Sequence, residues 1–284
     1  MRMPFGVSLV VTAWLSYSNA ILAQPSLIQN TGPIALKSVA DLNQQGTGVK
    51  VIGGREARSE DWQASFYAEG GGNRCTATLV GPRALLLAAH CVGNGQSAKI
   101  EFRQEPISGQ CIHAVGYKDS TGDQSADYAL CYLDKEVSGI QFETVNVDPS
   151  RIKKGNRLLL TGYGCTQPPA FPGEPPSGGN DGKYRIADAK IAALPGEPGN
   201  EPNTILMRDK TAICNGDSGG GAFLVLTPKK RLIVAINSRA WFDKGQSYLS
   251  SLSSAAGSEF IDTWIKTNQN AKICGRNLKD ESCR

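Results

Sequence analysis

The segment Cys214-Asn215-Gly216-Asp217-Ser218-Gly219-Gly220-Gly221 places a serine among glycines, with a cysteine at one end. A serine hydroxyl is a weak nucleophile at neutral pH, so it needs an adjacent base and an acid that orients this base. Glycines beside the serine allow backbone N–H groups to approach a negatively charged oxygen. Taken alone, the segment is equally consistent with a glycine-rich turn. It indicates a nucleophile only if the rest of the chain supplies the base and the acid.

Both partners occur upstream of Ser218. The segment Leu86-Leu87-Ala88-Ala89-His90-Cys91 ends an apolar run on a histidine, and Asp127 opens the apolar segment Asp127-Tyr128-Ala129-Leu130. The only other histidine, His113, has no such context, and we expect it to be structural or on the surface. The candidate residues therefore follow the order histidine, aspartate, serine.

This order separates the possible hydrolase folds. Residues 216–220 also fit G-x-S-x-G, the nucleophile turn of α/β-hydrolases. That fold places its histidine after the serine, whereas both histidines here precede Ser218. A subtilisin-like order would need an aspartate before His90, and only Asp41 and Asp61 are available. Both alternatives are therefore disfavoured.

The pattern around these segments is that of an all-β protein. Short apolar runs recur about every ten residues between turn-forming residues, which is typical of barrels and sandwiches. These runs are 64–67, 76–80, 84–89, 99–103, 111–117, 128–133, 157–162, 184–194, 204–207, 221–226 and 232–238. Residues 166–182 carry five prolines and predict a surface loop. Residues 259–266, with Gly257 or Ser258 at the start, have the apolar spacing of one C-terminal helix.

Composition limits the function classes. The chain has 284 residues, enough for one large domain or two small ones. The net charge of +4 is small and dispersed, so we expect neither nucleic acid nor a membrane as a partner. No carboxylate-rich loop or cysteine pair of the CxxC type is present, so we expect no metal and no cofactor.

The amino-terminal segment is typical of a signal peptide. Arg2 precedes the apolar run 7–15 and small residues follow, with expected cleavage after Ala23 or Ala20. A membrane anchor is the alternative, but the run is shorter than the ~20 residues that span a bilayer. All eight cysteines follow this segment, which predicts disulfides and secretion, extracellular or periplasmic if the source is bacterial. Eight cysteines allow 105 pairings.

Together with Val51-Ile52-Gly53-Gly54, the segments AAHC (88–91), DYAL (127–130) and GDSGG (216–220) make residues 51–268 resemble the trypsin/chymotrypsin family of serine endopeptidases. The resemblance implies two six-stranded antiparallel β-barrels with the active site between them and a C-terminal α-helix. The expected divisions are a signal peptide (1–23), an activation propeptide (24–50), the two barrels (51–148 and 149–256), and the helix with a disulfide-clipped tail (257–284).

The resemblance also assigns roles. It implies that His90 is general base and then general acid, that Asp127 orients it, and that Ser218 forms an acyl-enzyme. The N–H groups of Gly216 and Ser218 would form the oxyanion hole. Cleavage after Lys50 by a separate protease that cuts after basic residues would free the amino group of Val51 to pair with Asp217.

Two further features follow from the resemblance. Ala212 would lie at the base of the primary pocket and residues 238–240 (Ser238, Arg239, Ala240) on the substrate-pairing strand, so a preference for Lys or Arg is disfavoured. Cys75 would pair with Cys91. For the other cysteines we expect the pairs Cys111–Cys131, Cys165–Cys214 and Cys274–Cys283.

The sequence thus predicts a secreted, monomeric serine endopeptidase that acts on a protein or peptide and is made as a zymogen. Two other functions stay open. The chain could be a binding protein on a catalytically silent protease scaffold, or a hydrolase of non-peptide acyl groups on the same barrels.

Overall fold

The structure of the protein is a computed structural model, which describes residues 34–38, 54–70, 73–118, 122–167, 169–171, 174, 177, 178, 182–227 and 229–284. The predicted signal peptide, Lys50 and Val51 lie outside the described residues. Within the described part of the chain, no helix has the length and apolar character needed to cross a membrane.

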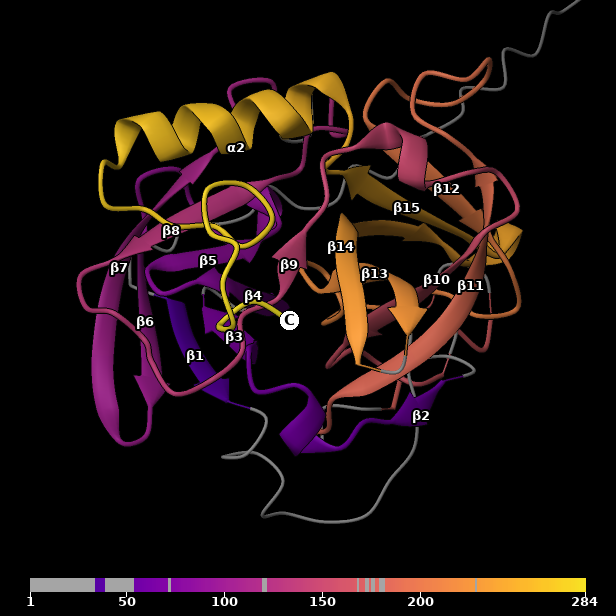
Figure 1. Cartoon of the computed structure of the whole chain (residues 1–284). Helices are drawn as coiled ribbons and strands as arrows, with labels where there is room; N and C mark the ends of the chain where they lie inside the picture. Colours follow the sequence, from indigo (N-terminus) through magenta and orange to yellow (C-terminus); the bar gives the residue numbers. More distant parts are fainter. Residues whose placement is uncertain are drawn as a thin grey trace, which may run out of the picture.

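The fold is mostly β, with two β-structures side by side and one C-terminal helix, α2, across the top of the first (Figure 1). The first structure is a closed barrel in the order β1-β3-β4-β5-β8-β7-β6. Its strands are β1 (Ile34–Ser38), β3 (Ser65–Gly70), β4 (Asn73–Gly81), β5 (Ala84–Leu87), β6 (Ser97–Phe102), β7 (Glu105–His113) and β8 (Ala129–Leu133). Its strands pair antiparallel except β1 and β6, which are parallel.

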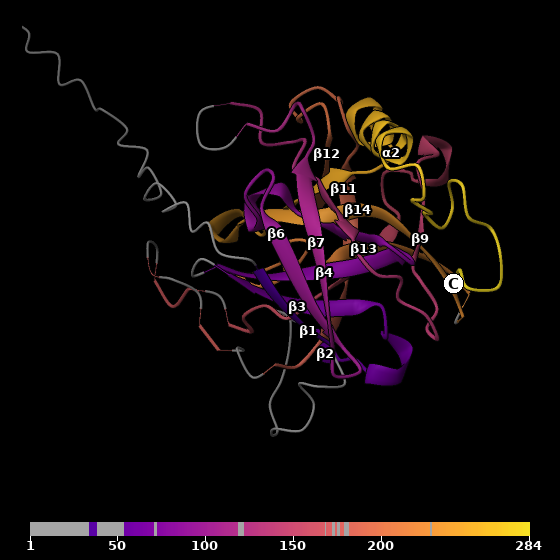
Figure 2. The ribbon, with the colours of Figure 1, turned by 90° about the vertical axis from the view of Figure 1, so that its left-hand side faces the viewer.

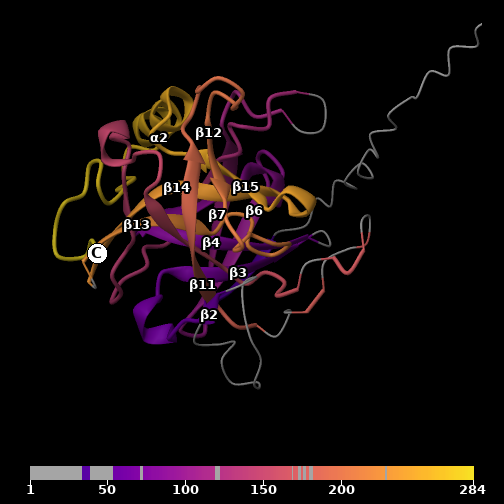
Figure 3. The ribbon, with the colours of Figure 1, turned by 90° about the vertical axis from the view of Figure 1, so that its right-hand side faces the viewer.

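The second structure is a curled sheet in the order β10-β13-β14-β15-β12-β11-β2. β10 also pairs with β11, so β10 to β15 follow one another around a ring. The strands are β2 (Arg55–Glu56), β9 (Thr144–Val145), β10 (Arg157–Gly162), β11 (Arg185–Ala193), β12 (Thr204–Arg208), β13 (Gly221–Thr227), β14 (Lys230–Trp241) and β15 (Gln246–Ser251). Figure 2 looks onto β6 and β7 of the first barrel, and Figure 3 onto β11 and β12 of the second sheet.

The predicted fold class is confirmed, with differences of detail. β1 adds a strand to the six expected in the first barrel, and it comes from the predicted propeptide. β2 lies in the range 51–148 expected for the first barrel, but it pairs with β11 of the second sheet. β15 was not predicted, because its sequence Gln-Ser-Tyr-Leu-Ser-Ser is mostly polar although it is largely buried between β12 and β14.

The helix α2 (Ala255–Thr267) begins earlier than the sequence predicted. Ser254 is its N-cap, since the Ser254 hydroxyl accepts a hydrogen bond from the Gly257 N–H at 3.1 Å. The buried face of α2 packs on the first barrel, where Trp264 lies against Tyr132. The C-terminal helix is therefore part of the first barrel's core.

All four disulfides have the predicted pairing. They are Cys75–Cys91, Cys111–Cys131, Cys165–Cys214 and Cys274–Cys283. The first joins β4 to the short 3₁₀ turn η2 (Ala89–Cys91), which carries His90. The last closes the C-terminal tail, which lies against Phe142, since the Phe142 N–H donates to the Ser282 carbonyl at 2.8 Å.

Candidate active site

His90 and Asp127 are brought together by strand pairing in the first barrel. β5 ends just before η2 and β8 begins just after Asp127, and Leu87 of β5 lies opposite Ala129 of β8. His90 Nδ1 lies 2.6 Å from Asp127 Oδ2, and the His90 N–H donates to Asp127 Oδ1 at 2.9 Å. A carboxylate at Nδ1 holds the proton on that nitrogen and leaves Nε2 able to accept another.

Asp127 is buried yet ionised. Burial by itself would raise the pKa of its carboxyl. The charge on His90 and the hydrogen bonds from His90 and Ser238 outweigh this effect and hold the pKa below its ordinary value. The buried carboxylate can therefore stabilise a positive charge on the neighbouring imidazole.

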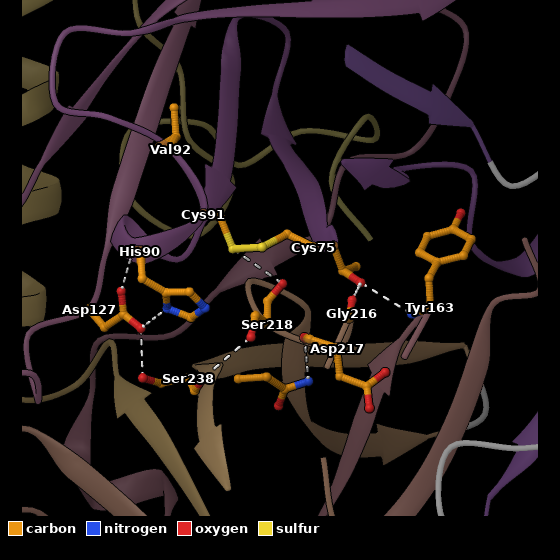
Figure 4. Close-up of a disulfide and its surroundings, with 12 residues drawn as sticks. Cys75, His90, Cys91, Val92, Asp127, Tyr163, Gly216, Asp217, Ser218 and Ser238 are labelled. Carbon is orange, nitrogen blue, oxygen red and sulfur yellow. Dashed lines mark hydrogen bonds and ion pairs between the residues drawn. A yellow bond between two sulfur atoms is a disulfide. The ribbon is translucent and has the colours of Figure 1, made fainter. Parts of the chain in front are cut away.

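Ser218 lies in the turn before β13, on the second sheet. Its Oγ donates to the Ser238 carbonyl at 3.4 Å, and Ser238 Oγ donates to Asp127 Oδ2 at 2.6 Å. Figure 4 shows the imidazole of His90 directed from Asp127 toward Ser218. The three residues that the sequence nominated as catalytic thus gather where the two β-structures meet.

The backbone around Ser218 depends on glycine. Gly216 has φ +104° and Gly219 has φ +82°, and a Cβ on Gly219 would lie 2.2 Å from the Thr76 carbonyl oxygen. Thr76 of β4 binds both flanking carbonyls, because its Oγ1 donates to Gly216 O at 2.8 Å and its N–H to Ser218 O at 2.7 Å. Among the described residues, none accepts a hydrogen bond from the N–H of Gly216 or Ser218. These two donors are available to an anionic oxygen.

Asp217 is fully buried behind Ser218. Its Oδ1 accepts from the Gly164 N–H and its Oδ2 from the Cys214 N–H, both at 2.8 Å. Burial raises the pKa of Asp217 to about 7, although both hydrogen bonds and the buried Arg185 act to lower it. A Cβ on Gly164 would lie 2.4 Å from the Asp217 carboxyl carbon, so glycine is required there. No local motif marks Gly164 or Arg185, because each acts on Asp217 only through the tertiary fold.

Ala212 and residues 238–240 are the positions expected to contact substrate. Ala212 is buried, and Ala240 lies opposite Ser247 on β15. Ser238, on the strand expected to pair with substrate, directs its hydroxyl to Asp127. Arg239 forms a two-pronged ion pair with Glu201, in which Nη1 and Oε1 lie 3.1 Å apart and Nη2 and Oε2 lie 2.5 Å apart.

Two other sequence expectations concern histidine and metal. His113 on β7 has its Nε2 2.6 Å from the Val92 carbonyl and its ring edge-on to Tyr117, so it has a structural position. Ligand atoms of Cys75, Cys91 and His90 lie within 4.8 Å of one another. Both sulfurs are committed to a disulfide, however, so this cluster does not offer thiolate ligands to a metal.

A two-part β-fold that brings His90, Asp127 and Ser218 together at its junction has the architecture of trypsin-like serine proteases. The chain belongs to the trypsin family: the family model described as Trypsin matches residues 51–247.

Solved structures share the fold at low sequence identity. Human heparin binding protein has a TM-score of 0.58 at 19% identity, and the match covers 78% of this chain and 99% of that one. Neuropsin, a serine protease expressed in the limbic system of mouse brain, has a TM-score of 0.54 at 21% identity, covering 78% of this chain and 100% of that one.

Proposed function

We propose that the protein is a secreted serine endopeptidase that hydrolyses peptide bonds through an acyl-enzyme and is made as a zymogen. The observation that carries this proposal is the hydrogen-bonded series Ser218–Ser238–Asp127–His90 beside the N–H groups of residues 216 and 218, which donate to no residue in the described part of the chain. Acyl transfer needs a nucleophile, a base that accepts its proton and an acid that orients the base, and Ser218, His90 and Asp127 match these three parts.

The geometry supports the following mechanism. Ser218 Oγ attacks the peptide carbonyl carbon while its proton passes to His90 Nε2. The carbonyl oxygen becomes negative and accepts hydrogen bonds from Gly216 and Ser218 N–H. Asp127 stabilises the imidazolium, which then protonates the leaving amine as the C–N bond breaks. A water molecule then attacks the carbonyl carbon of the acyl-enzyme while His90 accepts a proton from the water. His90 returns this proton to Ser218 Oγ as the carboxylic acid product is released.

The proposed activation follows from Asp217. Its carboxyl is buried, and its pKa of about 7 shows that the ionised form lacks full compensation. Cleavage after Lys50 would create the ammonium of Val51, which can supply the missing positive charge. We assign this cut to a second protease that cuts after basic residues, because Ala212, at the expected base of the primary pocket, offers no acid to bind a lysine. The four disulfides and the apolar run 7–15 support secretion.

A binding function on the same scaffold is the second candidate, because a protein named for binding heparin shares this fold. The test uses the protein cleaved after Lys50, incubated with a peptide library, beside its Ser218→Ala variant. We expect peptide-bond cleavage by the first and none by the second. Equal background from both would favour the binding function, and turnover of acyl esters without any peptide cleavage would favour a non-peptide hydrolase.

A further inference from the structure

The first barrel is closed by a strand from upstream of the predicted activation site. β3 pairs with β1 and β4, and β6 pairs with β1 and β7, so in the described structure β1 alone bridges β3 and β6. Leu36, at the centre of β1, lies opposite Ala68 of β3 and Ile100 of β6. Figure 2 shows β1 lying alongside β3 and β6.

Nothing covalent would hold β1 in place after activation. Residues 34–38 precede Lys50, and the first cysteine of the chain is Cys75. A cut after Lys50 therefore leaves no peptide bond or disulfide between β1 and the rest of the barrel. Only the strand pairing remains.

We infer that the seam between β3 and β6 is a strand-binding site for residues 34–38, and that the cleaved upstream segment stays in the mature protein as a non-covalent subunit. This inference rests on the proposed activation after Lys50. The ligand is an extended peptide recognised mainly through its backbone, as in β-strand addition.

The physical reason is the free-energy cost of exposing the edges of β3 and β6 when β1 leaves. Without β1, two long strand edges would expose unpaired N–H and C=O groups. These edges flank the barrel core, because Phe66 and Ala68 of β3 and Ala98 and Ile100 of β6 are all buried. β1 pairs on both of its sides, so it forms twice the backbone contacts that a peptide added to a single edge would form.

The experiment needs a defined cut. The variant Gly46→Asp, Thr47→Asp, Gly48→Asp and Val49→Asp places four aspartates before Lys50, so an endopeptidase that recognises this sequence cuts there and leaves Val51 first. The cleaved protein is passed over a size-exclusion column under native conditions, and the protein peak is analysed by mass spectrometry. We expect the fragment that ends at Lys50 in a one-to-one ratio with the body. A folded body that elutes without the fragment would overturn the inference.

A proline substitution tests the role of the strand itself. Leu36→Pro removes a backbone donor from the middle of β1 and should lower the retained fraction about tenfold. Gln29→Pro, upstream of β1, is the matched control and should leave retention unchanged.

Should Leu36→Pro fail to fold, amide hydrogen exchange on the cleaved parent protein gives the same information. The amides of β3 and β6 should stay as protected as in the uncleaved protein, and loss of protection in both strands would contradict the inference. Labelling of Ser218 by a serine-directed phosphonate in the same sample separates the two proposals. Labelling of Ser218 in protein that has lost the fragment would contradict only the strand-binding site. Retention of the fragment in protein that is not labelled would contradict only the proposed activity.

Discussion

Ser238 links the nucleophile to the acid of the candidate site. Its carbonyl accepts from Ser218 and its hydroxyl donates to Asp127, so one residue of β14 fixes two of the three side chains. The family resemblance assigned Ser238 to the substrate-pairing strand. Its contact with Asp127 was not predicted, because it spans 111 positions and no local motif marks it. Strand β14 therefore holds Ser238 where it contacts both Ser218 and Asp127.

Replacing this hydroxyl should impair turnover without unfolding the protein. In Ser238→Ala, Asp127 loses one charge-assisted hydrogen bond, and such bonds are worth about 1.5–3 kcal/mol. We expect kcat/KM to fall by about tenfold to a hundredfold. Ser250→Ala is the matched control, since Ser250 Oγ is buried and has no hydrogen-bond partner among the residues that the structure describes. Equal effects of both substitutions would show that Ser238 does not position Asp127.

Asp217 should make the stability of the uncleaved protein depend on pH. Its pKa is raised from 3.8 to about 7, so the folded state holds a proton that the unfolded state releases. This contribution is fully present below about pH 4 and is lost as the pH rises through 7. Urea titrations between pH 4 and 8 should therefore show a falling free energy of unfolding, and Asp217→Asn should flatten the fall. An unchanged slope in Asp217→Asn would contradict the assignment.

Glu201 should weaken the attraction of Arg239 for acidic residues of a substrate. It holds Arg239, which follows Ser238 on the strand beside the candidate nucleophile. In Glu201→Gln the guanidinium loses its counter-charge, so we expect a severalfold rise in kcat/KM for peptides with an acidic residue near the cleaved bond. The control is Glu197→Gln, whose parent carboxylate pairs only loosely with Lys154 at 3.8 Å. A peptide-library profile identical to the parent's would show that Arg239 does not face substrate.

At the scale of elements, the disulfide Cys75–Cys91 fixes η2, the turn that carries His90, to β4. Removing such a bond commonly costs about 2–5 kcal/mol of stability. We expect the pair of substitutions Cys75→Ala and Cys91→Ala to lower both the free energy of unfolding and kcat/KM.

The tail disulfide provides the comparison for this prediction. Cys274 and Cys283 close a loop at the C-terminus, so their double alanine variant should lose stability and keep its kcat/KM at temperatures where it stays folded. If the two double variants lose activity equally, the position of η2 does not depend on Cys75–Cys91.

The sequence predicted the elements whose pattern is local. The apolar runs near His90, Asp127 and Ser218 became β5, β8 and β13, because burial of one or both strand faces shows in the sequence. β1 and β15 were missed, since a five-residue run and a serine-rich run have no distinctive period. Their strand conformation comes from neighbours distant in sequence.

At the scale of the whole molecule, a buried ion pair joins the two β-structures. Glu143 donates its N–H to the Leu79 carbonyl on β4, while its carboxylate binds both Arg231 Nε, at 2.9 Å, and Nη2 on β14. The Arg231 guanidinium also lies 3.4 Å from the centre of the Trp62 ring. Glu143 thus connects β4 of the first barrel to β14 of the second sheet.

Breaking one side of this pair should be costly. Glu143→Ala leaves a buried guanidinium without its counter-charge, and we expect the free energy of unfolding to fall by about 3–5 kcal/mol in urea titrations. Glu136→Ala, which removes an exposed partner of Arg83, should change it by about 1 kcal/mol or less. Similar losses in the two variants would show that the buried pair does not hold the halves together.

The most direct measurement is the labelling of the Val51-started protein with a serine-directed phosphonate, followed by mass spectrometry of its peptides. Activation of Ser218 by His90 predicts a single adduct on Ser218 in the parent protein and a loss of at least about a thousandfold in labelling rate in His90→Ala. An unlabelled Ser218 in folded, correctly cleaved protein, or equal labelling in both proteins, would contradict it.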